Sequence, residues 1–262
     1  GQSIYSNMII VQEKTEGCEE LGLELTFDSI ANVPVADASS VSDWNTFFDL
    51  PTNGSPFTSV VVDGNKVTLV GGSGITIKDY LFFENLNLLS VLKGIEIVSV
   101  GFAGFGYCDN LTEISLLGIT DAEQIAFANN TSLEVLNFPL LTTAGDGCFS
   151  ANQLVNATNF PLLEIAGDHC FSGLTANNVF SFPSLLSCGN NCFASCYNAT
   201  EFYLPLCANI GLTTGNNDVF LNIIGQTITL TIPAALMTCN GGNPDGDIQY
   251  LQANNTVTII TV

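Results

Sequence analysis

Phenylalanine recurs at one fixed interval through the middle of the chain. It stands at six positions, each 22 residues after the last: Phe83, Phe105, Phe127, Phe149, Phe171 and Phe193. A unit of this length is too short to bury its own apolar side chains, so successive units must stack on one another. The spacing therefore predicts a coil of stacked rungs, in which equivalent side chains touch from one rung to the next.

Other columns keep the same interval. One column consists of a glycine and five apolar residues: Gly94, Leu116, Phe138, Phe160, Phe182 and Leu204. In the last four units, the next residue is proline: Pro139, Pro161, Pro183 and Pro205. Within a unit, Leu136 and Phe138 alternate with Val135 and Asn137, which is typical of a short strand with one buried face. Proline ends each strand because it has no amide to donate to the next rung.

The segment "AFANNTSLEVLNFPLLTTAGDGCF" resembles the BspA-type leucine-rich repeat, in a 22-residue variant. The family pattern AF-x-x-C-x-x-L-x-x-I-x-L-P, then L-x-x-I-G, is met over roughly residues 82–210. In the segment quoted, the matching residues are Ala126, Phe127, Leu133, Leu136, Phe138, Pro139, Leu141, Ala144 and Gly145. The resemblance implies a β-rich solenoid, a right-handed coil with one short parallel strand per rung.

The chain departs from the family pattern at several places. The cysteine of the pattern is present as Cys108 and Cys196, but Asn130, Asn152 and Leu174 stand in the units between them. Two inward positions are also polar: Thr158 and Asn177.

Three regions follow from where the interval holds. We expect an N-terminal segment and cap at 1–81, a solenoid of about six rungs at 82–218, and a C-terminal cap at 219–262. Such caps, here non-repeating α/β and β segments, cover the exposed ends of a stack.

The charge of the chain excludes two classes of partner. It carries 25 acidic residues against four lysines and no arginine, for a net charge of −21. This balance argues against binding nucleic acid or anionic lipid. No apolar run is long enough to span a bilayer, so membrane insertion is not expected. The first residues also lack the basic and apolar regions of a signal peptide.

The nine cysteines follow the repeat rather than a disulfide framework. Cys148, Cys170 and Cys192 lie one interval apart, so each is expected to be a small apolar residue in the core. A disulfide outside the cell that involves Cys18 or Cys239, which lie outside the repeats, is the alternative.

Catalytic residues are not evident. His169 is the only histidine, and its neighbours Asp168 and Cys170 cannot form a relay with it because adjacent side chains point in different directions. We interpret His169 as a turn residue.

Cys188, Cys192 and Cys196 belong to separate columns, so a zinc site is not indicated either. A glycan hydrolase would need a pair of carboxylates across a cleft, which the repeats do not mark. The chain is therefore predicted not to be an enzyme.

Calcium is a minor hypothesis. Asp146 and Asp168 lie one interval apart, and stacked oxygen ligands could hold this cation. The alternative, which we favour, is that both are turn-forming residues. No other cofactor is expected.

The outward strand positions are more varied than the inward ones. Two outward columns, which begin at Val91 and at Lys93, follow the 22-residue interval. Their candidate ligand-binding residues are Glu113, Val135, Asn137, Asn159, Ser181, Glu201 and Tyr203. A rigid surface that can vary without disturbing the core suits the binding of a partner.

What the resemblance implies agrees with this interpretation, since similar repeats occur in surface adhesins and in receptor-binding proteins displayed on virions. We therefore expect a non-enzymatic recognition or adhesion protein, extracellular on a virion or bacterial surface, that binds a host surface protein or glycan through the outer face. The alternative is a structural subunit. In that case residues 1–26 would mediate self-association or attach the chain to a virion or surface anchor.

Overall fold

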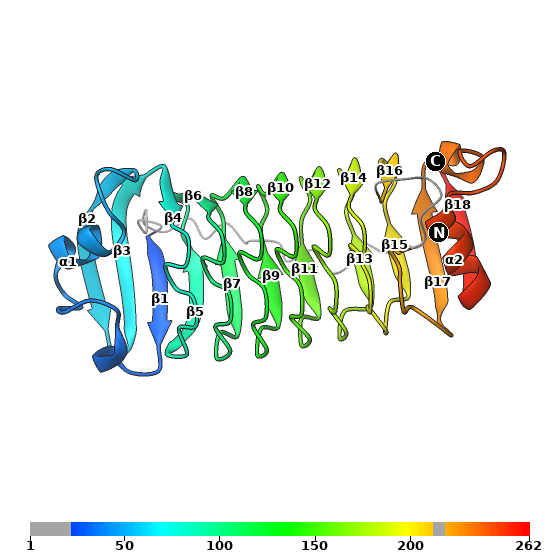
Figure 1. Cartoon of the computed structure of the whole chain (residues 1–262). Helices are drawn as coiled ribbons and strands as arrows, with labels where there is room; N and C mark the ends of the chain where they lie inside the picture. The colour runs from blue at the N-terminus through cyan, green and yellow to red at the C-terminus, as the bar shows by residue number, and fades with distance from the viewer. Residues whose placement is uncertain (1–21, 212–217) are drawn as a thin grey trace, which may run out of the picture.

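Stacked rungs form an elongated rod with a cap at each end (Figure 1). The computed structural model describes residues 22–211 and 218–262. The β-rich solenoid of about six turns expected from the repeat is confirmed. Cys18 and most of the proposed 1–26 assembly segment lie outside the described residues.

Each rung contributes a second short strand in addition to the expected one. The longer strands are β5 (Leu88–Lys93), β7 (Glu113–Leu116), β9 (Val135–Asn137), β11 (Ala157–Asn159), β13 (Val179–Ser181) and β15 (Glu201–Tyr203). The second set, which we call the shorter strands because most of them have two residues, comprises β4 (Ile75–Ile77), β6 (Ile97–Val100), β8 (Asp121–Ala122), β10 (Thr143–Ala144), β12 (Ile165–Ala166), β14 (Ser187–Cys188) and β16 (Asn209–Ile210). Strands of two residues are too short to show alternation in a sequence.

Pairing between rungs is parallel and keeps the repeat interval. Val135 lies opposite Ala157, and Thr143 lies opposite Ile165. The shorter strands form one continuous sheet from β4 to β16. The longer strands divide into two sheets. The first has the order β11-β9-β7-β5-β1-β3-β2, in which β1 (Leu23–Phe27), β3 (Lys66–Ser73) and β2 (Ser55–Asp63) belong to the N-terminal cap. The second has the order β13-β15-β17-β18, in which β17 (Thr227–Ile232) and β18 (Thr256–Thr261) belong to the C-terminal cap.

The division between β11 and β13 coincides with the two polar inward positions. Thr158 is half-buried in β11, where the neighbouring strands carry Leu136 and Phe180. Asn177 is buried, and its Nδ2 donates to the carbonyl of Val179 at 2.9 Å. A side chain that bonds this carbonyl competes with the backbone ladder. We call this position the strand break.

The N-terminal cap joins the stack through a central strand. It comprises β1 (Leu23–Phe27), a 3₁₀ turn (Ile30–Asn32), α1 (Val41–Phe47), β2 (Ser55–Asp63) and β3 (Lys66–Ser73). Strand β1 pairs antiparallel with β3 on one side and with β5 of the first rung on the other. Trp44 and Phe48 are fully buried beneath the cap and continue the core of the rungs.

The C-terminal cap closes the other end. It comprises β17 (Thr227–Ile232), a 3₁₀ turn (Ala234–Met237), α2 (Gly246–Asn254) and β18 (Thr256–Thr261). Helix α2 is capped by Asp245, whose side chain accepts the amide of Asp247 at 3.0 Å. Ile248 and Leu251 are fully buried and cover the last apolar layer.

A column of stacked phenylalanine rings runs along the core. Successive rings from Phe105 to Phe193 have centroids 5.4–5.8 Å apart and nearly parallel planes. Phe220 extends the column at the C-terminal end, 5.8 Å from Phe193. The stacked rings expected from the interval are present, because this arrangement buries each ring between two others.

The first member of the column differs from the expectation. Phe82, not Phe83, stacks on Phe105, with ring centroids 4.9 Å apart. The first interval is one residue longer, since Val91 pairs with Ile114. The outward columns therefore do not begin at Val91, which is buried. A one-residue offset moves every side chain to the other face.

Buried asparagines replace the family cysteine in two rungs. Asn152 Oδ1 accepts the amide of Asn130 at 2.8 Å, and Asn152 Nδ2 donates to the carbonyls of Phe127 and Phe149 at 2.9 and 2.8 Å. Asn130 Oδ1 accepts the amide of Cys108 at 2.7 Å in the same way. These asparagines satisfy backbone groups inside the turns, where no water reaches.

Candidate functional site

The candidate ligand-binding residues lie on one outer face, along the longer strands. Glu113, Asn159 and Ser181 are exposed, whereas Val135, Asn137, Glu201 and Tyr203 are half-buried. The strand break separates them into two groups. The first group lies on β7, β9 and β11, and the second, with Ser181, Glu201 and Tyr203, lies on β13 and β15.

A ladder of side-chain hydrogen bonds joins Asn137 and Asn159 of the first group to Ser115. Asn159 Nδ2 donates to Asn137 Oδ1 at 2.7 Å, and Asn137 Nδ2 donates to Ser115 Oγ at 2.7 Å. Each bond joins one rung to the next. The ladder fixes the orientation of these amides before any partner binds, which lowers the entropy cost of binding.

Asp146 and Asp168 occupy the same place in successive turns, and each bonds the backbone of the following rung. Asp146 Oδ1 accepts the amide of Asp168 at 2.9 Å, and Asp168 Oδ1 accepts the amide of Asn190 at 2.8 Å. Asp79 makes the equivalent bond to the amide of Phe102 at 2.9 Å. A Cβ added at Gly167 would collide with Asp146 Oδ1, and one added at Gly189 would collide with Asp168 Oδ1, so the glycine of the following rung leaves room for each carboxylate.

This geometry supports the turn interpretation of the two aspartates. Among residues 22–211 and 218–262, no group of three or more His, Cys, Asp or Glu side chains is arranged to hold a metal ion. The calcium hypothesis stays a prediction, but the carboxylates have a structural role without it.

We expect Asp146→Ala to lower the free energy of unfolding by about 1–2 kcal/mol, because it removes a charge-assisted hydrogen bond to the Asp168 amide. Urea unfolding measures this loss. The effect should be the same with excess calcium or with EDTA. A rise in thermal stability on adding calcium to the wild-type chain, absent from Asp146→Ala, would instead establish a calcium site.

The cysteines of the repeats are inert core residues. Seven of the cysteines in the described ranges are buried as free thiols, including Cys148, Cys170 and Cys192. Burial raises the pKa of Cys108 and of Cys196 to about 12, so neither thiol ionises near neutral pH. Cys239 is exposed and is also a free thiol.

His169 lies in a turn, as expected. Its φ of 57° matches those of Gly147 (60°) and Asn191 (55°), which occupy the same column. A left-handed backbone in every rung identifies this column as a turn.

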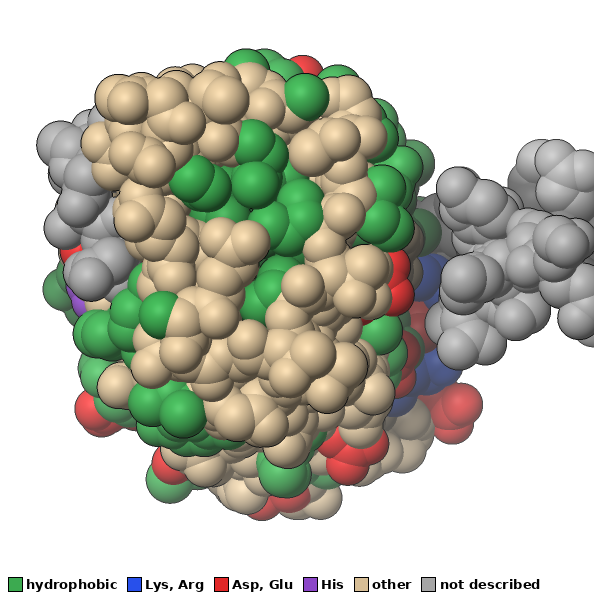
Figure 2. Space-filling model, turned by 90° about the vertical axis from the view of Figure 1, so that its right-hand side faces the viewer, with side chains coloured by type: hydrophobic (Ala, Val, Ile, Leu, Met, Phe, Trp, Pro, Cys, Tyr) green, Lys and Arg blue, Asp and Glu red, His purple; other side chains and the backbone are tan. Residues whose placement is uncertain are grey.

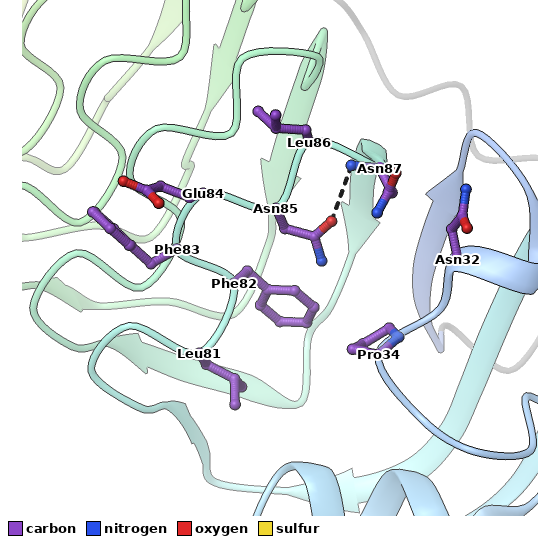
Figure 3. A pocket seen from close by; sticks show the side chains of 9 residues that line it. All are labelled: Asn32, Pro34, Leu81, Phe82, Phe83, Glu84, Asn85, Leu86 and Asn87. Carbon is purple, nitrogen blue, oxygen red and sulfur yellow. Dashed lines mark hydrogen bonds between the residues drawn. The ribbon is translucent and has the colours of Figure 1, made fainter.

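A shallow pocket of about 520 Å³ lies between the N-terminal cap and the first rung. Figure 3 shows the side chains of Phe82, Asn85 and Pro34 facing this space, while those of Phe83 and Glu84 point away from it. Asn85 Oδ1 accepts the amide of Asn87 at 3.1 Å. Sequence reasoning missed the pocket because its walls come from segments about 50 positions apart. Glu84 is its one acidic lining residue, so the pocket lacks an acid–base pair.

A buried carboxylate distinguishes the C-terminal cap. Asp247 is fully buried, and its Oδ1 accepts the amide of Val219 at 2.8 Å while its Oδ2 is buried without a hydrogen-bond partner. Loss of water, together with the nearby charges of Asp245 and Asp218, raises the pKa of Asp247 to about 7. The pKa of Asp245 is also raised by burial.

The stability of the protein should therefore fall as the pH rises to about 7. The folded-state pKa of Asp247 lies above its unfolded value, so its contribution is fully present below about pH 4 and is lost as pH rises through 7. Asp247→Asn removes this titration. From pH 5 to pH 8, the free energy of unfolding of the variant should rise relative to that of wild type by on the order of 1–2 kcal/mol. Urea unfolding at both pH values measures the difference, and an equal pH response in both proteins would contradict the assignment.

The helices of the structure are short. Helices α1 and α2 have seven and nine residues, and within the described ranges no helix has the length and apolar character needed to cross a bilayer.

Comparison with known proteins agrees with the geometry of the rungs. The model of the BspA type leucine rich repeat region matches six copies over residues 75–200 and 126–240. No curated protein matches the sequence significantly.

Three solved structures are similar to this chain at low identity. A leucine-rich repeat protein from Bacteroides ovatus is 12% identical, over 77% of this chain and 67% of its own, with a TM-score of 0.38. The pneumococcal vaccine antigen PcpA is 9% identical over 66% and 67%, with a TM-score of 0.35. A leucine rich cell surface protein from Faecalibacterium prausnitzii is 12% identical over 78% and 86%, with a TM-score of 0.31. Because the family model covers more than half of the sequence and its repeats coincide with the observed rungs, the chain belongs to the BspA-type leucine-rich repeat family.

Proposed function

We propose that this protein is a non-enzymatic recognition or adhesion protein that contacts its partner through the outer face of β7, β9, β11, β13 and β15. Membership in a family of binding repeats supports this role. The observation that carries the proposal is the contrast between the two sides of these strands. Inward positions are apolar and buried except at the strand break, whereas the outward ones vary in chemistry, and a side-chain ladder fixes Asn137 and Asn159 among them.

The partner we propose is a host surface protein or a glycan, met outside the cell with the protein displayed on a virion or bacterial surface. Amide and hydroxyl groups at Asn159 and Ser181 suit hydrogen bonding to either, and Tyr203 supplies an aromatic anchor. The exposed carboxylate of Glu113, on a chain with a net charge of −21, favours a neutral or basic partner over an acidic one.

The test compares variants on the two sides of the rod. The chain is applied to a glycan array and to a panel of immobilised extracellular receptor domains, and any ligand found is titrated by biolayer interferometry. Asn159→Ala combined with Tyr203→Ala should weaken binding at least tenfold. The matched control is Ile165→Ala on β12, which belongs to the sheet of shorter strands and is exposed. Equal losses in both variants would show that the outer face is not the binding surface.

The second proposal is an assembly role for the N-terminal segment, by self-association or by attachment to a virion or surface anchor. Its described part does not form a free arm, because β1 (Leu23–Phe27) is an internal strand between β3 and β5. Deleting residues 1–26 would therefore remove a core strand. A deletion of residues 1–21 is the appropriate test, since it leaves β1 intact.

A further inference from the structure

The C-terminal end of the rod differs from the rest of the molecule in charge. Asp245 and Asp247 are the only charged residues after position 218, and both are buried. Residues 219–262 therefore expose no charged side chain, on a chain whose net charge is −21. Figure 2 views this end directly: apolar and neutral polar side chains fill the face, and acidic ones lie toward its margin.

The same end carries an open strand edge. Among the strands of residues 22–211 and 218–262, β18 is the last of its sheet and pairs only with β17. The amides of Thr256 and Val262 donate to the carbonyls of Gln226 and Ile232 of the β17 segment, at 2.9 and 3.1 Å. In a parallel pair, alternate residues face the neighbouring strand. The backbone groups of Val257, Ile259 and Thr261 therefore face away from β17, toward the open edge.

The features that usually protect an edge strand are missing from β18. Its sequence TVTIIT has no charge and no proline, and its pairing with β17 runs without a bulge. The edge strand at the opposite end, β2, has Pro56, ends at Asp63, and contains an irregularity between Phe57 and Ser59. The chain thus blunts the edge at its N-terminal end, whereas no strand of the described residues pairs with the outer edge of β18.

We propose that two copies of this chain associate tail to tail, with β18 of one copy antiparallel to β18 of the other. An exposed row of amides and carbonyls is complemented by another extended strand. In an antiparallel pair with two-fold symmetry, the same edge serves both copies and the contact closes as a dimer. This approach also keeps the acidic parts of the two copies far apart, whereas side-by-side contact would bring like charges together. The pairing would extend the sheet of longer strands from one rod into the next.

Sedimentation equilibrium on the 262-residue chain over a range of concentrations tests the proposal, under reducing conditions because Cys239 is exposed. The wild-type mass should approach twice 27.7 kDa. Ile260→Glu places a carboxylate on the exposed surface of β18, and Thr261→Pro removes an outward amide without disturbing the bonds to β17. Each should weaken dimerisation at least tenfold.

The matched control is Leu162→Glu, because Leu162 is 44% exposed on the side of the solenoid and Ile260 is 46% exposed. It should dimerise as wild type does. Circular dichroism confirms that each variant is folded. A monomer at all concentrations, a dimer that survives both β18 variants, or association beyond a dimer would overturn the proposal. Loss of the dimer on deleting residues 1–21 would also overturn it, in favour of the N-terminal segment.

Discussion

Phe149→Ala should lower the free energy of unfolding by about 3–5 kcal/mol. The Phe149 ring is fully buried, and its centroid lies 5.4 Å from those of both Phe127 and Phe171. Phe160 packs against it at 5.0 Å. Truncation leaves a cavity in the middle of the column, where the rungs on either side cannot collapse into it without breaking their own pairing. Urea unfolding followed by circular dichroism measures the loss.

The first rung offers the control for this prediction. Phe82 is buried in the column, while Phe83 is only partly buried and contacts the exposed rings of Tyr80 and Tyr107. Phe82→Ala should therefore cost about 3–5 kcal/mol and Phe83→Ala about 1 kcal/mol. The reverse order would show that the 22-residue interval extends unchanged to Phe83 and that the longer first interval is wrong.

Asn152→Ala should cost about 2–4 kcal/mol. The side chain is fully buried and makes three hydrogen bonds, one from the Asn130 amide and two to the carbonyls of Phe127 and Phe149. Alanine leaves an amide and at least one carbonyl without partners inside the turn. Their desolvation is then uncompensated, which is why the loss should exceed that of an exposed asparagine.

The family cysteine provides a graded comparison. Cys108 Sγ donates to the carbonyl of Phe82 at 2.9 Å, and Cys196 Sγ donates to that of Phe171 at 3.3 Å. Asn152→Cys should restore a donor to the Phe127 carbonyl but not the acceptor for the Asn130 amide. Its stability should therefore lie between those of wild type and Asn152→Ala. If Asn152→Cys and Asn152→Ala were equally destabilised, the carbonyl bond would be unimportant.

Much of this fold follows from one interval in the sequence. Phe127, Leu136 and their equivalents must stack if a 22-residue unit is to bury them. The start of the first rung was misplaced because Phe82 and Phe83 are adjacent, and only the pairing of Val91 with Ile114 distinguishes them. The two-residue strands were also beyond prediction, since the backbone pairing that defines them depends on neighbouring rungs.

The candidate site was predictable to a similar extent. Alternation along the strands correctly placed Asn137 and Asn159 on the outer surface. The spacing also indicated that Asp146 and Asp168 stack, but not that each bonds a backbone amide, because that depends on the direction of the peptide group in the next turn. The charge-free end could not be recognised until the structure showed that Asp245 and Asp247 are buried.

The strand break gives the rod a mechanical weak point near its centre. The sheet of longer strands is interrupted between β11 and β13, while the sheet of shorter strands continues past it. When the rod bends so that β11 and β13 move apart, no backbone ladder between these two strands resists the movement. Flexion should therefore concentrate there, which would let the two groups of outer-face residues tilt relative to each other and follow a curved target.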